Sequence, residues 1–189
     1  MSIFDNLNKG TSEERPEIKP IEKVQKTEIF TFKALPESLE EMKALEEAKL
    51  ETPFQAAALT VCALCAYAAA PEIGKDMLNF LRGPRPVSNY DISFLKDRFM
   101  DVKTYIPFSY FEGAKPENDY NPSQPFKLTI QTNPYSYEQE GYCKLFIQSG
   151  GADSMRFVVL RQKGDGQWCL WEQHLLSGIR EPKSQDPWA

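Results

Sequence analysis

The sequence predicts an α+β fold, in which N-terminal helices pack on a C-terminal antiparallel meander sheet of about four strands. Helix-start and helix-stop signals bracket the apolar segments between residues 38 and 99. Alternating apolar and polar residues, divided by turn residues, follow between residues 126 and 173. The chain has 189 residues, of which 41% are hydrophobic, and this suits a single domain with a polar tail.

Composition and charge exclude several classes of function. The net charge of -5 argues against a broad nucleic-acid-binding surface, and a single histidine excludes a multi-histidine metal site within one chain. The most apolar stretch, residues 56–70, would span about 22 Å as a helix, which is shorter than a bilayer core of about 30 Å. We therefore expect no nucleic-acid partner and no membrane partner.

The first 26 residues are predicted to form a flexible arm, and residues 27–189 a single α+β domain. The arm is rich in charged residues and proline, so it buries too little apolar surface to offset the entropy lost on ordering. Its few large apolar side chains (Ile3, Phe4 and Leu7) leave open whether part of it docks elsewhere. A short strand is predicted at residues 28–32, before the first helix.

Capping signals mark the first two helices. Ser38, followed by Glu41, predicts the start of one helix. The run Thr52-Pro53-Phe54-Gln55 predicts the start of the next, because it places a capping hydroxyl before a proline at the first helical position. This second helix is apolar on nearly every side as far as Pro71, so we expect it at the centre of the core.

Two more helices follow. The third is predicted at residues 72–82, ended by Gly83 and Pro84, and the fourth runs from Ser88 to Phe99. Residues 105–125 then form a long loop whose aromatic side chains favour packing across the domain over disorder.

The last strands are predicted to be apolar on both faces. Cys143, Leu145 and Ile147 share one face of the second meander strand, while Tyr142 and Phe146 share the other. The turn at residues 163–166 joins the last two strands, where large side chains again point both ways. Helices can cover only one face, so the aromatic loop, the arm, a partner subunit or a ligand must cover part of the other.

The candidate chemical motifs favour structural roles. Cys62 and Cys65 match Cys-x-x-Cys but lie well inside an apolar helix, where small core residues are expected. All four cysteines lie in apolar patterns, which predicts reduced thiols and a cytoplasmic protein. His174 is the sole histidine, and because no Gly-x-Ser-x-Gly motif occurs, a surface or capping role is favoured over a catalytic triad. We predict no catalytic residue, no metal site and no cofactor.

Three segments resemble an uncharacterised bacterial domain-of-unknown-function family: MLNFLRGPRPVSNYD (77–91), SYFEGAKPENDYNPSQP (109–125) and DPWA (186–189). The resemblance covers about residues 50–189 and implies no activity or site residue. Separately, helices followed by a meander ending in GDGQWCLWEQ (164–173) resemble the NTF2-like architecture. In the usual NTF2-like order a pair of strands interrupts the helices, whereas this sequence predicts one strand before them.

The function favoured by these observations is a non-catalytic binding domain that associates with a second copy or a protein partner through an apolar sheet face. The alternative is a small-molecule-binding domain or enzyme with a pocket lined by residues 105–125. The candidate ligand-binding residues are Arg85, Tyr105, Tyr110, Asn118 and Tyr120. For Arg85 two interpretations stay open, because arginine near a helix C-terminus stabilises the helix and can also bind a carboxylate or phosphate.

Overall fold

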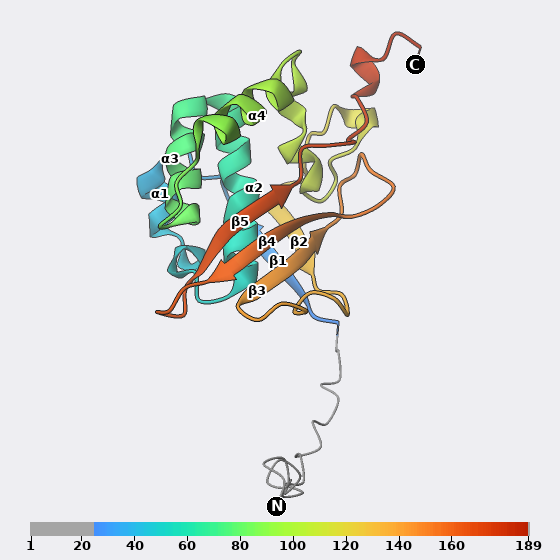
Figure 1. The fold of residues 1–189 in the computed structure, drawn as a ribbon. Coiled ribbons are helices and arrows are strands. Elements are labelled where there is room, and N and C mark those ends of the chain that lie inside the picture. The colour runs from blue at the N-terminus through green and yellow to red at the C-terminus, as the bar shows by residue number, and fades with distance from the viewer. Residues whose placement is uncertain (1–24, 189) are drawn as a thin grey trace, which may run out of the picture.

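A computed structural model describes residues 25–188 of the chain. The predicted arm therefore lies almost wholly outside the described residues. Its last residue, Lys26, is described, and its backbone N–H donates to the Thr132 hydroxyl over 2.8 Å. The described residues form an antiparallel sheet with helices on one face, which confirms the predicted α+β class (Figure 1).

The sheet contains five strands rather than about four. They lie in the order of the chain: β1 (Thr27–Phe32), β2 (Phe126–Gln131), β3 (Tyr142–Ile147), β4 (Arg156–Gln162) and β5 (Trp168–His174). The additional member is β1, which pairs antiparallel with β2 although all four α-helices of the described residues lie between the two in sequence. Sequence alone shows a short strand there but not its partner, because that pairing is non-local.

Three of the four α-helices of the described residues begin where the capping signals at Ser38, Thr52 and Ser88 predict, and the third in sequence begins at Pro71 without a side-chain cap. The four are α1 (Leu39–Ala44), α2 (Pro53–Ala69), α3 (Pro71–Arg82) and α4 (Asn89–Phe99). At the start of α2 the Gln55 N–H donates to the Thr52 hydroxyl over 3.3 Å, and the Thr52 N–H donates to the Gln55 side chain over 3.2 Å. Ser88 and Asp91 make the corresponding pair of hydrogen bonds at the start of α4. These bonds satisfy N–H groups that have no partner within a helix.

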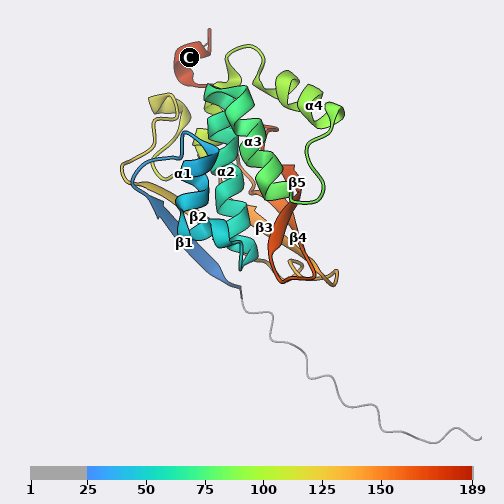
Figure 2. The ribbon, with the colours of Figure 1, turned by 90° about the vertical axis from the view of Figure 1, so that its left-hand side faces the viewer.

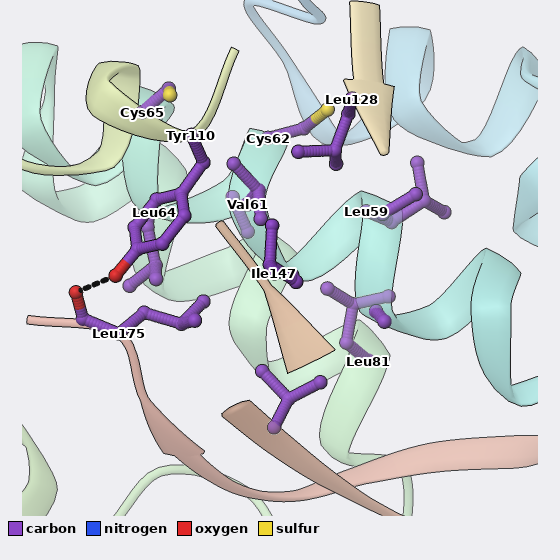
Figure 3. Close-up of a cluster of buried hydrophobic side chains, with 14 of the residues drawn as sticks. Leu59, Val61, Cys62, Leu64, Cys65, Leu81, Tyr110, Leu128, Ile147 and Leu175 are labelled. Carbon is purple, nitrogen blue, oxygen red and sulfur yellow. Dashed lines mark hydrogen bonds between the residues drawn. The ribbon is translucent and has the colours of Figure 1, made fainter. Parts of the chain in front are cut away.

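Helix α2 lies between the sheet and the outer helices α1 and α3, as predicted (Figure 2). The inner face of the sheet packs on it with fully buried side chains: Leu128, Ile130, Leu145, Ile147, Val158 and Leu160. Cys62 and Cys65 belong to this core (Figure 3), and burial raises the pKa of both thiols. Among the described residues, no helix combines the length and apolar character needed to cross a membrane.

The loop at residues 105–125 packs across the domain, as its aromatic content predicts. It contains 3-10 turns, and its residue Phe111 forms a β-bridge with Leu128 of β2. The Glu112 N–H donates to the Lys127 carbonyl over 2.9 Å, so the loop adds to β2 on the side where β3 diverges.

Candidate functional site

A cleft of about 440 Å³ opens beside β5, between that strand, α4 and the connection from α3 to α4. Its floor is apolar and is formed by Leu64, Leu78, Leu95 and Leu170. Two arginines, Arg82 and Arg85, lie at its rim. We call this cleft the arginine cleft. The volume lies within the range of about 300–1,000 Å³ that is usual for small-ligand sites.

The first arginine, Arg82, is held by groups of its own chain. Its guanidinium is buried, with Nη2 at 3.4 Å from the Asp91 carboxylate and Nε donating to the Arg85 carbonyl over 3.0 Å. Burial alone would raise the pKa of the Asp91 carboxyl, but hydrogen bonds from Ser88 and the charges of Arg82 and Arg85 lower it overall. Arg82 and Asp91 therefore form a compensated pair that shapes the rim.

The second arginine, Arg85, is exposed, and its guanidinium lies over the Trp171 indole. Its guanidinium carbon lies 4.3 Å from the centre of the Trp171 ring, and the guanidinium carbon of Arg161 lies 4.8 Å from the same ring. In the described part of the chain, no acidic side chain lies within ion-pair distance of Arg85 or of Arg161. Arg85 therefore has hydrogen-bond donors available for an external group.

The cleft continues onto the outer face of the sheet, the side away from α2. Figure 1 looks onto this face, and no described helix lies over β3 and β4. Aromatic and cationic side chains alternate there, and we call them the outer patch: Tyr142, Lys144, Phe146, Phe157, Arg161 and Trp171. The Lys144 ammonium lies 3.9 Å from the centre of the Phe157 ring, and the Tyr142 and Trp171 rings meet edge to face at 5.6 Å.

The outer patch changes the interpretation of the two-sided apolar strands. Its rings are only half-buried, and part of their cover comes from Lys144 and Arg161 of the same sheet. Long cationic side chains can lie along apolar surface while their charge stays in water. From the sequence we predict that the loop, the arm, a partner subunit or a ligand covers part of the outer face, and cations of the sheet itself are not among these sources.

Of the predicted site residues, Tyr105 and Tyr120 are brought together but not around a shared ligand pocket. Their rings stack at 5.1 Å with an angle of 10° between the planes. The Tyr120 hydroxyl donates to the Arg180 carbonyl over 2.6 Å, and burial raises the pKa of Tyr120 to about 12. Tyr105 also borders a smaller surface cleft of about 240 Å³, beside Asp101 and Glu181.

Tyr110 and Asn118 likewise stabilise the loop. The buried Tyr110 hydroxyl donates to the Leu175 carbonyl (Figure 3). The Asn118 side chain accepts from the Lys115 N–H over 3.0 Å and donates to the Gly113 carbonyl over 2.8 Å. Only Arg85 of the five predicted residues lines the arginine cleft.

The residues that sequence reasoning missed are Trp171 and Arg161. Side chains alternate between the two faces along β5, so the sequence places Trp171 on the face opposite to that of Leu170. The register shift between Val159 and Leu160, which leaves Trp171 without a paired residue on β4, has no corresponding signal in the sequence.

The geometry favours recognition of an anionic group with an apolar body. Arg85 supplies donors, the leucines of the floor supply apolar contact, and Trp171 joins the two regions. Among the described residues, no three His, Cys, Asp or Glu side chains gather as metal ligands would. His174 stacks on Phe157 at 4.4 Å and lies 3.4 Å from Glu172 at the edge of the cleft.

A sequence profile of the family described as Domain of unknown function (DUF6935) matches residues 34–183. The chain belongs to the DUF6935 family. This confirms the resemblance to a domain-of-unknown-function family. The DUF6935 match spans α1–α4, the loop and β2–β5, and therefore both the arginine cleft and the outer patch, whereas β1 lies outside it. Neither the curated proteins nor the solved structures include a match to this chain.

Proposed function

We propose that this DUF6935 domain is a non-catalytic binding module that recognises an anionic group, a carboxylate or a phosphate, through the arginine cleft. The observation that carries the proposal is the Trp171 ring, which contacts the Arg85 and Arg161 guanidiniums at the mouth of an apolar cleft. Arginine is suited to this role because its planar N–H groups match the two oxygens of a carboxylate or phosphate.

Stacking on Trp171 prepares Arg85 for binding. A guanidinium stacked on a ring uses its face, while its five N–H donors lie in the plane and stay available. Because the ring restricts the rotamers of Arg85, less conformational entropy is lost when an anion binds. The leucine floor then favours a ligand whose anionic group is attached to an apolar body.

The charge of the outer patch favours an anionic partner over a second copy of the chain. In a two-fold symmetric dimer the same patch occurs on both subunits, so the cations Lys144 and Arg161 would face a patch that carries the same positive charges. Glu172 is the one acidic residue of β5 available to offset them. Since like charges across an interface weaken association, self-association through this face is the less favoured form of the binding function.

The cytoplasm is the compartment that we propose for this module. All four cysteines are free and buried, so the fold contains no cross-link that would require an oxidising compartment.

The proposal is tested by titrating the purified full chain with indole-3-acetate and, separately, inorganic phosphate, followed by two-dimensional NMR. We expect saturable shifts of the Trp171 indole signal and of the Val87 and Leu170 amides. Arg85→Gln should weaken binding about tenfold, the size of one charge-assisted bidentate contact. Arg180→Gln makes the same charge change at an exposed site outside the cleft and should leave the affinity unchanged. No saturable shift with either probe at millimolar concentration would overturn the proposal.

A further inference from the structure

A second hollow, the alanine groove, shares no lining residue with the arginine cleft. It has a volume of about 600 Å³ and lies between the connection from β1 to α1, the end of α2 and the loop. Its floor consists of the small side chains of Ala66, Ala69 and Ala70. Large apolar side chains border it, namely Leu35, Ile73, Phe108 and Phe126.

The shape of the alanine groove suits an inserted aromatic side chain. Alanines allow a guest to approach the α2 backbone closely, while Phe108 and Phe126 offer ring contacts on its flanks. Ile73 at the rim is 37% exposed, and Ala69 is exposed as well. Apolar side chains left accessible in a groove make it a candidate contact site.

The residues that precede the described part of the chain contain a matching segment. Phe4 is the one aromatic residue among residues 1–26, and it lies between Ile3 and Leu7. Ile3 and Leu7 place two more apolar side chains within three residues of Phe4 along the sequence. The rim of the groove carries one charge of each sign, Lys33 and Glu37.

The chain is long enough for this segment to reach the groove. The groove begins at Lys33, directly after β1, and β1 spans about 20 Å from its start at Thr27 (Figure 2). Residues 8–26 can extend to about 60 Å, roughly three times that span. A tethered segment also has an effective concentration in the millimolar range, so a weak contact is enough to hold it.

We propose that residues 3–7 of the same chain dock in the alanine groove, with Phe4 inserted over Ala66, Ala69 and Ala70. The contact is intramolecular, because the tether favours it over the same segment of another copy. The outer patch and the arginine cleft stay open, so this inference does not depend on the proposed function.

Paramagnetic relaxation in the full-length protein tests the docking. A nitroxide attached to Asp5→Cys should broaden the amide signals of Ala66, Ala69, Ala70 and Ile73, whereas the signal of Val159, on the outer face, should stay sharp. The native thiols are buried and should not take the label in the folded protein. Phe4→Ser in the labelled chain should remove the broadening, and Ile21→Ser should leave it in place.

A second variant changes the groove rather than residues 3–7. Ala69→Trp fills the groove from an exposed helix position and should also abolish the broadening. Broadening at the groove no greater than at Val159 would overturn the proposal. A mixed sample combines nitroxide-labelled chains without isotope and isotope-enriched chains without nitroxide. Broadening found only in that sample would also overturn the proposal, because the groove would then hold residues 3–7 of a second copy.

Discussion

The Arg85 guanidinium lies 4.3 Å from the centre of the Trp171 ring, which joins the connection after α3 to the last strand of the sheet. Arg161 of β4 contacts the same ring at 4.8 Å. The indole thus lies between two cations from different elements, of which Arg85 lines the arginine cleft. This arrangement suits binding, because both guanidiniums are oriented before a ligand arrives.

Replacing Trp171 by leucine should weaken anion binding without unfolding the domain. The change removes the ring that orients Arg85 before a ligand arrives, so binding must order that side chain at a cost of about 1 kcal/mol, and we expect the Kd for indole-3-acetate to rise about fivefold. Isothermal titration calorimetry measures the effect. Trp188→Leu is the matched control, because Trp188 is 93% exposed and lies outside the cleft. Equal affinities for the two variants would contradict the role of Trp171.

Asp91→Asn should destabilise the domain at neutral pH by about 1–2 kcal/mol, since it removes a charge-assisted cap and the partner of Arg82. The folded-state pKa of the Asp91 carboxyl lies below its ordinary value of 3.8. Its contribution is therefore complete above that value and is lost as the pH falls towards the folded-state pKa.

Urea unfolding at several pH values measures this dependence. The difference between wild type and Asp91→Asn should shrink as the pH falls below 3.8. Asp76→Asn serves as the control, because Asp76 is an exposed carboxylate of α3. A difference that stays constant down to the acid transition would argue against a charged Asp91 as the source.

Gly74→Ala should destabilise the packing of α3 on α2. A Cβ at Gly74 would lie 2.2 Å from the Tyr67 Cα, so the two helix backbones would have to separate. We expect a loss of about 1–3 kcal/mol despite the better helix propensity of alanine. For a domain of this size the melting temperature should fall by about 2–4 °C for each kcal/mol.

Gly164→Ala is the matched control for Gly74. Nothing lies within 4 Å of a Cβ at Gly164. The melting temperature of that variant should stay within about 1 °C of wild type, as for other unconstrained surface substitutions. A stabilised Gly74→Ala protein would show that the helices have room to move apart.

Tyr110→Phe should loosen the C-terminal segment. The change leaves the Leu175 carbonyl without the hydroxyl donor in a buried position, and the expected cost is about 1–2 kcal/mol. Hydrogen exchange should rise at Leu175 and Leu176. Tyr90→Phe should change neither stability nor exchange, because Tyr90 is 80% exposed. Unchanged protection at Leu175 would mean that this hydrogen bond does not hold the segment.

Local sequence patterns predict which face of a strand a side chain occupies, but they do not predict which groups a buried side chain contacts. Alternation along β3 correctly separated Cys143 and Leu145 from Tyr142 and Phe146, because side-chain direction alternates along any strand. The alternative function predicts that aromatic residues of the loop line a pocket; in the structure the Tyr110 and Tyr120 hydroxyls donate to backbone carbonyls. Composition shows that such rings must be buried but not which groups they meet.

The sequence by itself determined the α+β class, the helix starts and the buried α2, because caps and periodicity act over a few neighbouring residues. Only the tertiary structure decided that β1 pairs with β2 and that Trp171 meets both Arg85 and Arg161. These contacts join residues far apart in the chain. They depend on strand register and on how α3 packs against β5, and no local pattern encodes either.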